Sequence, residues 1–119
     1  MRTLEPSGGL AAPKTYLTAW LLVMLKEQNL HGYEILKELR TKFDVMSDAS
    51  TVYRALRQLE TEGYISSWWD PNGQGPPRRI YTITIEGQQA LMQWSVTLEQ
   101  YRSKMNAFFT MYGGELARD

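Results

Sequence analysis

Two arginines, Arg54 and Arg57, occupy the polar side of a predicted helix and could bind nucleic acid. A guanidinium group can donate paired hydrogen bonds to guanine O6 and N7 or to a phosphate, and serine, threonine and glutamine adapt to either partner. At about 100° per residue, the opposite side of this helix is apolar and would dock on its own domain. The apolar members are Ala49, Val52, Tyr53, Leu56 and Leu59. The candidate DNA-contacting residues are Ser50, Thr51, Tyr53, Arg54, Arg57 and Gln58.

A second arginine pair, Arg78 and Arg79, follows a loop dense in glycine and proline at residues 70–77. This loop separates two short β-prone runs, Tyr64–Trp69 and Arg79–Ile83, so the pair would lie on a hairpin. Exposed arginines on such a hairpin can bind DNA phosphates. Either pair alone could be an ordinary solvated surface feature. Their order along the chain, helix and then hairpin, favours DNA binding.

Other kinds of chemistry find little support in this sequence. His31 is the only histidine, cysteine is absent, and the carboxylates lack metal-loop spacing, so no metal or cofactor is expected. No nucleophile motif accompanies His31, and no enzymatic activity is predicted. The His31–Gly32 pair should instead shape the turn before a helix. Trp68 and Trp69 are expected to place one ring inward and one on the hairpin, with base stacking as the alternative.

Three helices are predicted before the hairpin. The first, Lys14–Gln28, is apolar on every side, which indicates burial between two layers. A break at residues 29–32 precedes a second helix that runs to about Phe43, and a short connection leads to the third helix. That helix should start near Asp48, with Ser47 or Asp48 as its N-cap, and end at Gly63.

This order of elements predicts a mainly α (α+β) fold, a winged helix-turn-helix domain with a long C-terminal dimerisation helix. Four segments are expected in the 119-residue chain. They are a flexible N-terminal arm (1–13), a winged-helix DNA-binding domain (14–84), the dimerisation helix (85–112) and a tail (113–119).

The overall charge does not by itself favour a nucleic-acid partner. Thirteen basic and thirteen acidic residues give no net charge, whereas DNA-binding domains are often basic. Locally clustered arginines would therefore have to bind the DNA. The first residues lack the pattern of a signal peptide, and the longest apolar run, Ala19–Leu25, is too short to span a membrane. A cytoplasmic protein is expected.

The last predicted helix, Glu86–Tyr112, carries an uninterrupted heptad pattern, with Thr84 as its candidate N-cap and Gly113–Gly114 at its end. Apolar residues recur at alternating intervals of three and four, which holds one seam against a partner helix. They are Leu91, Trp94, Leu98, Tyr101, Met105, Phe108 and Tyr112. The pattern predicts a homodimer that binds double-stranded DNA at an inverted-repeat operator. The alternative is that the whole seam docks within its own chain.

Several linked motifs over about residues 15–90 resemble the PadR family of bacterial transcriptional regulators. The matching stretches are Leu30–Ile35, Ser50–Leu56, Leu59–Gly63, Gly75–Thr82 and Ile83–Gly87. Two positions depart from the family pattern, because Ser50 stands where glycine is common and Arg54 where proline is common. The Ala49–Glu60 run and the paired tryptophans also resemble PadR-type repressors linked to polyhydroxybutyrate metabolism in bacilli.

The resemblance implies a repressor of a nearby operon that often responds to a small molecule, and the single C-terminal helix resembles the smaller subtype. A small apolar or aromatic effector would then bind near the dimer axis, with Trp20 and Trp94 lining its pocket; the alternative is that both rings are plain core. A different possibility is a winged helix without DNA binding that serves as a protein-interaction module, which zero net charge favours.

Overall fold

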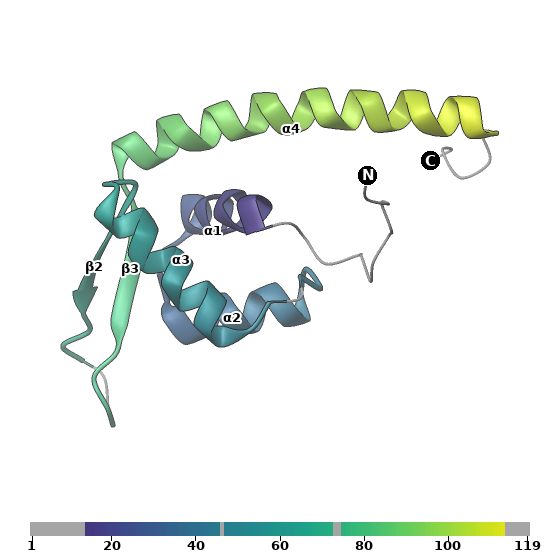
Figure 1. Cartoon of the computed structure of the whole chain (residues 1–119). Helices are drawn as coiled ribbons and strands as arrows, with labels where there is room; N and C mark the ends of the chain where they lie inside the picture. Colours follow the sequence, from purple (N-terminus) through teal and green to yellow (C-terminus); the bar gives the residue numbers. More distant parts are fainter. Residues whose placement is uncertain (1–13, 46, 73–74, 114–119) are drawn as a thin grey trace, which may run out of the picture.

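The computed structural model describes residues 14–45, 47–72 and 75–113. The expected arm (1–13) and all of the expected tail except Gly113 lie outside the described residues. Along the chain the elements are α1 (Lys14–Glu27), β1 (Leu30–His31), α2 (Gly32–Thr41), α3 (Ala49–Thr61), β2 (Ile65–Trp69), β3 (Arg79–Ile83) and α4 (Ile85–Tyr112). Figure 1 shows a small domain with α4 running above it and extending past its edge.

Helix α1 is the centre of the hydrophobic core. Leu21 and Leu22 have no exposed surface, and Leu17 and Leu25 are almost as fully buried. The helix is apolar on all sides because α3, the sheet and α4 all contact it, and Figure 1 shows it between α4 and the other two helices. The predicted burial between two layers is confirmed.

Helix α2 ends at Thr41, two residues before the predicted end at Phe43. Asp44 adopts the left-handed conformation, with φ of 55°, and turns the chain so that the backbone N–H of Val45 donates to Leu39 O at 2.8 Å. Val45 is thereby buried in the core, and Phe43 packs against Trp20 with ring centroids 4.8 Å apart.

Helix α3 begins and ends as its sequence predicts. Of the two candidate N-caps, Asp48 takes the role, since its Oδ1 accepts a hydrogen bond from the backbone N–H of Thr51 at 2.9 Å. Gly63 follows the helix with φ of 84°, a left-handed conformation in which glycine has no Cβ penalty. Val52, Leu56 and Leu59 are buried, so the apolar side of α3 faces the core.

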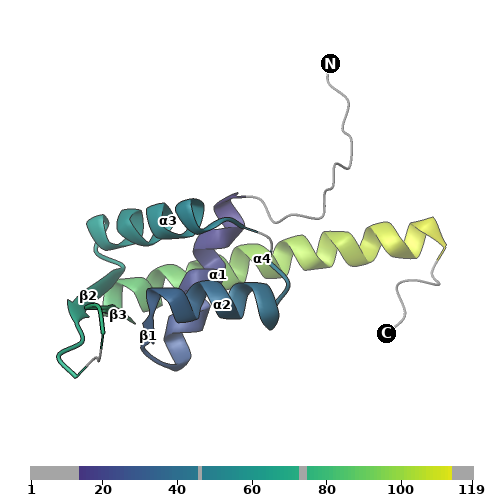
Figure 2. The same ribbon diagram turned by 90° about the horizontal axis from the view of Figure 1, so that it is seen from below.

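The sheet has three antiparallel strands in the order β1-β3-β2. Strand β1 was not predicted, because two residues are too few to show an alternating pattern and the segment was expected to be only a break. It pairs Leu30 with Tyr81 and His31 with Ile80, and Figure 2 shows it beside β3 at the start of α2. The expectation that one tryptophan ring packs inward is wrong: Trp68 is 41% and Trp69 56% exposed.

Helix α4 is fastened at its first turn to the beginning of β2. Thr84, the predicted N-cap, accepts a hydrogen bond from the backbone N–H of Gly87 at 3.0 Å and donates one to Gly63 O at 2.7 Å. The backbone N–H of Thr84 also donates to Tyr64 O at 3.0 Å. The helix starts at Ile85, one residue earlier than predicted. These bonds set the direction in which α4 leaves the domain.

Candidate nucleic-acid interface

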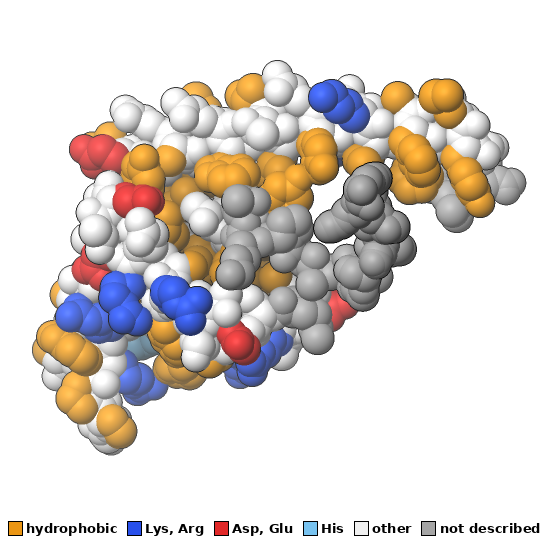
Figure 3. Space-filling view, in the orientation of Figure 1, with side chains coloured by type: hydrophobic (Ala, Val, Ile, Leu, Met, Phe, Trp, Pro, Cys, Tyr) orange, Lys and Arg blue, Asp and Glu red, His pale blue; other side chains and the backbone are white. Residues whose placement is uncertain are grey.

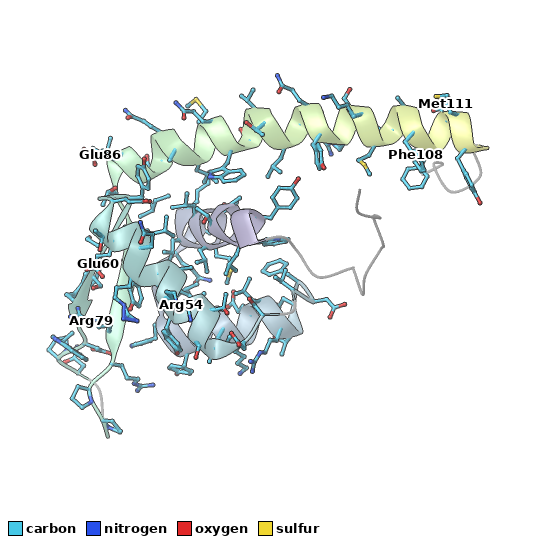
Figure 4. All side chains as sticks on the ribbon, in the orientation of Figure 1. Arg54, Glu60, Arg79, Glu86, Phe108 and Met111 are labelled. Carbon is cyan, nitrogen blue, oxygen red and sulfur yellow. The ribbon has the colours of Figure 1, made fainter. Side chains whose placement is uncertain are left out.

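The outer face of α3 presents Arg54 and Arg57, which are both exposed. Ser50 and Gln58, which were also predicted to contact DNA, are exposed on the same helix. Figure 3 shows basic side chains gathered over α3 and the neighbouring hairpin, and Figure 4 places Arg54 among them. Long cationic side chains on an exposed helix face can reach base edges in a major groove.

Thr51 and Tyr53, the other two predicted α3 contacts, are half-buried. The backbone N–H of Thr51 is engaged by the helix cap. The ring of Tyr53 packs against the core and lies so close to Gly32 that a Cβ on that glycine would be 2.7 Å from Tyr53 Cε1. The fold therefore uses Tyr53 to pack α3 against the start of α2.

Arg79 is connected to α3 by a chain of polar contacts. Its Nη1 donates to Ser67 Oγ at 2.9 Å, and Ser67 Oγ donates to Glu60 Oε2 at 2.8 Å. The guanidinium carbon also lies 4.6 Å from the centroid of the Trp69 ring, within the range of a cation–π contact. Arg79 and Glu60 are labelled on the same side of the molecule as Arg54 in Figure 4. The polar chain holds the hairpin arginine in place beside α3.

Arg78 is held by the start of α2 in a similar way. Its Nη1 donates to Tyr33 Oη at 3.0 Å, and its guanidinium carbon lies 5.3 Å from the centroid of the Tyr33 ring. The two predicted hairpin arginines therefore each have an aromatic partner, and both are half-buried. Sequence reasoning did not find Tyr33, Ser67 or Glu60, because their partners are distant in the chain or on another strand.

His31 joins the hairpin to α2. Its Nδ1 lies 3.0 Å from Glu34 Oε1, and its Nε2 lies 3.0 Å from Oδ2 of Asp70, 39 residues away. The backbone N–H of His31 also donates to Glu34 Oε1 at 2.7 Å. The predicted role of His31 in shaping the turn is confirmed, since it is the N-cap of α2. The spacing of three between His31 and Glu34 is a capping-box signal, but no local pattern indicates Asp70.

The pKa values of this cluster shift in the directions that its geometry dictates. Hydrogen bonds with Asp70 and then with Glu34 raise the pKa of His31 above its ordinary 6.5. Partial burial acts to raise the pKa of Glu34, but its hydrogen bonds with the backbone and ring of His31 outweigh this and lower it. The backbone N–H of Asn72 and then the His31 ring lower the pKa of Asp70.

The family profile of the transcriptional regulator PadR-like family matches residues 21–93, which span α1 to the first part of α4. The chain belongs to the PadR-like family. The resemblance predicted from the sequence motifs is therefore confirmed, whereas the narrower likeness to the polyhydroxybutyrate-linked repressors is untested and stays a prediction. No match was found among curated proteins.

Solved structures of PadR-like and related regulators share this fold. A transcriptional regulator from Clostridium thermocellum is 31% identical, with a TM-score of 0.72, and the match covers 88% of this chain and 98% of that one. A PadR family regulator from Clostridium difficile is 26% identical, with a TM-score of 0.71 and coverage of 79% and 98%. A PadR-like regulator from Bacillus cereus, at 22% identity, has the same fold with a TM-score of 0.72 and coverage of 86% and 96%.

Family membership makes the protein a DNA-binding transcriptional regulator and not an enzyme. It favours DNA binding over the alternative of a winged helix that only binds proteins. Among the described residues no cluster of three or more His, Asp or Glu could hold a metal ion. None of the described helices combines the length and the apolar character that crossing a membrane requires.

The heptad seam of this PadR-like chain divides into two parts. Leu91, Trp94 and Leu98 are half-buried, and the first two pack against the core that contains α1. Beyond them the seam leaves the domain, and Figure 3 shows hydrophobic side chains continuing along the underside of α4 to its far end. The exposed fractions there are 51% for Tyr101, 44% for Met105, 56% for Phe108 and 70% for Tyr112. The alternative that the whole seam docks within its own chain is therefore wrong, because its second half is exposed.

Trp20 and Trp94, the predicted effector-pocket residues, line one groove between α1 and α4. Its volume is about 340 Å³. Tyr16 stands at one side, with its ring centroid 6.4 Å from that of Trp94 and 6.0 Å from that of Tyr101, both edge to face. The lining residues are Tyr16, Ala19, Trp20, Val23, Leu91, Trp94, Ser95 and Leu98. Trp20 and Trp94 thus line the same groove, and binding of an effector there stays a prediction.

Proposed function

We propose that this PadR-like protein is a repressor that binds an inverted-repeat operator as a homodimer, with α3 in the major groove and the hairpin on the phosphate backbone. The observation that carries this proposal is the gathering of exposed arginines on one face of α3, beside the hairpin arginines and opposite the core. Zero net charge is compatible with it, because the local field at the contact surface governs binding.

The two arginine pairs have different surroundings, which supports different roles. Arg54 and Arg57 are exposed and can adjust to base edges, as direct readout requires. Arg78 and Arg79 are oriented in advance by Tyr33 and Ser67, which suits a fixed contact with a phosphate. Ser50, Thr51, Tyr53 and Gln58 are the remaining proposed contacts of α3.

The test is DNA binding by two double variants, measured over a range of salt concentrations on a duplex from upstream of the protein's own gene and on a random duplex. Arg54→Ala with Arg57→Ala should weaken specific binding by about 1–3 kcal/mol for each arginine–base pair that the variant removes. The loss on random DNA should be smaller, because there the two arginines contribute only their charge. Arg78→Ala with Arg79→Ala should weaken binding to both duplexes and reduce the salt dependence by roughly two units.

A matched control removes two positive charges elsewhere, at the exposed Lys26 and Lys104 on α1 and α4. This variant should change both affinities equally and slightly, since screening weakens distant charges. Unchanged specific affinity in the α3 variant would refute the assignment of α3. A hairpin variant that loses only sequence preference would show that the hairpin reads bases.

The dimer proposal is supported by the exposed half of the heptad seam. Four large apolar side chains at Tyr101, Met105, Phe108 and Tyr112 project from a helix that has left the domain. An apolar stripe of this kind on a monomer would be an unusual patch in water. A second α4 packed along the seam would cover it. The two-fold axis would then present two copies of α3 to successive major grooves, about 34 Å apart.

The effector proposal is supported by the groove between α1 and α4. Aromatic and aliphatic side chains from both helices line it, and ligand pockets are mostly apolar with few polar groups. We infer that a small apolar or aromatic molecule binds there against Trp20 and Trp94. Because the groove adjoins the proposed dimer seam, a bound molecule would alter the angle between the two halves of the dimer.

A further inference from the structure

The ring of His31 faces a carboxylate oxygen on each side, Glu34 Oε1 at Nδ1 and Asp70 Oδ2 at Nε2, both at 3.0 Å. Ionised carboxylates only accept hydrogen bonds. Both ring nitrogens must therefore carry a proton for both contacts to be hydrogen bonds, so this arrangement requires the imidazolium form. The side chains of His31 and Asp70 are only 19% and 15% exposed, which limits replacement of either contact by water.

The contact between His31 and Asp70 joins α2 to the base of the hairpin. Asp70 directly follows β2, and its backbone N–H donates to Arg78 O on the opposite limb at 2.8 Å. Its Oδ1 also accepts from the backbone N–H of Asn72 at 3.0 Å. The adjacent Arg78 bonds to Tyr33, two residues from His31. The hairpin is thus attached twice to the start of α2, once through His31 and once through Tyr33.

We propose that His31 is a positioning residue for DNA binding. As an imidazolium it holds the hairpin and its arginines against α2, and loss of its proton removes one of the two attachments of the hairpin to α2. This inference rests on the proposed role of the hairpin in DNA binding. His31 touches no DNA itself in this scheme. It acts through Asp70 on the placement of Arg78 and Arg79.

The direction of the pH effect follows from the groups around the ring. Glu34 and Asp70 favour the imidazolium and Arg78 opposes it, while Tyr33, Tyr53, Tyr81 and Arg79 line the small cavity beside it. A neutral ring has one N–H. When that proton is on Nδ1 and bonded to Glu34, Asp70 faces the lone pair of Nε2 and its hydrogen bond to the ring breaks. The His31 contribution is complete below the ordinary pKa of 6.5 and disappears as the pH rises through the raised pKa. At low pH the contribution of His31 is lost again when the carboxylates of Asp70 and Glu34 become protonated.

The test compares the wild type with Asp70→Asn at pH 6 and pH 8.5. An asparagine amide can accept from a protonated Nε2 or donate to a bare one, so this variant keeps the hydrogen bond in both forms. Asp70→Asn also removes one negative charge, which strengthens DNA binding at both pH values and cancels when the affinity at pH 6 is divided by that at pH 8.5. We expect operator affinity of the wild type to fall roughly two- to fivefold more than that of the variant over this range, as the competent hairpin population falls.

The single histidine allows a direct measurement without DNA. The ring signals of His31 in the NMR spectrum of the wild type should titrate above 6.5, and those of Asp70→Asn should titrate lower. The amides of Asp70 and Arg78 should become more mobile at pH 8.5 only in the wild type. A His31 pKa at or below 6.5, or equal pH dependence of affinity in the two proteins, would overturn the inference. Absence of DNA binding at every pH would instead refute the proposed function, while the NMR titration still decides the state of His31.

Discussion

Replacing Gly87 with alanine should destabilise this protein, although glycine-to-alanine changes inside helices usually stabilise by about 0.5–1 kcal/mol. Gly87 is buried in the first turn of α4. A methyl group there would lie 2.0 Å from the carbonyl oxygen of Tyr64 and 2.7 Å from Ile83 Cγ1. Contacts of a Cβ below 3.0 Å are essentially never observed, and the obstacle is backbone, which cannot rotate away.

The magnitude follows from what must move. To make room, α4 and the start of β2 must separate by about 1 Å, and overpacking of this kind costs about 1–3 kcal/mol. The same movement strains the bonds from Thr84 to Gly63 O and Tyr64 O, 2.7 and 3.0 Å long, each worth about 1 kcal/mol. We expect Gly87→Ala to lose about 2–4 kcal/mol of unfolding free energy, or roughly 10 °C in Tm.

Urea and thermal unfolding at one fixed protein concentration would measure this, because dimer stability depends on concentration. Gln88→Ala, at the exposed neighbouring position, is the matched control and should stay within about 0.5 kcal/mol of the wild type. Gly63→Ala separates backbone strain from steric overlap, since Gly63 has φ of 84° and nothing within 4 Å of the added Cβ; it should cost about 1–2 kcal/mol. A Gly87→Ala protein as stable as the wild type would refute the reasoning.

Two further predictions concern α4. Tyr101→Glu with Phe108→Glu changes side chains that are exposed in the single chain, so the domain should stay folded. Sedimentation should then show a monomer, and operator affinity should fall at least tenfold. Gln93→Glu with Gln100→Glu, off the seam, should stay dimeric, whereas a dimeric seam variant would contradict the proposed interface. Small aromatic compounds that bind the α1–α4 groove should quench tryptophan fluorescence. Trp94→Phe should reduce that change, and Trp94→Phe with Trp20→Phe should remove most of it, because both rings line the groove. An equal response in the double variant would place the binding site elsewhere.

Local patterns were sufficient to predict most elements of the domain. The apolar side of α3, its Asp48 cap and the glycine that follows it depend on residues within four positions of one another, so the sequence predicts them before any tertiary contact exists. The same holds for Thr84 as the cap of α4 and for the face that carries Arg54 and Arg57. Family membership could also be predicted, because its motifs are contiguous runs such as residues 30–35 and 50–56.

Features that depend on distant partners required the tertiary structure. Strand β1 exists only because Leu30 and His31 pair with β3, and two residues carry no periodicity of their own. The heptad in α4 is continuous in sequence, yet α1 partly covers Leu91 and Trp94 while Tyr101 and Phe108 lie beyond the domain. His31 was correctly expected to shape a turn, but its bond to Asp70 spans 39 residues. The spacing of residues along the chain determines which side chains share a helix face, but it does not determine which distant loops come together. Only the tertiary structure therefore places the Asp70 carboxylate beside the His31 ring.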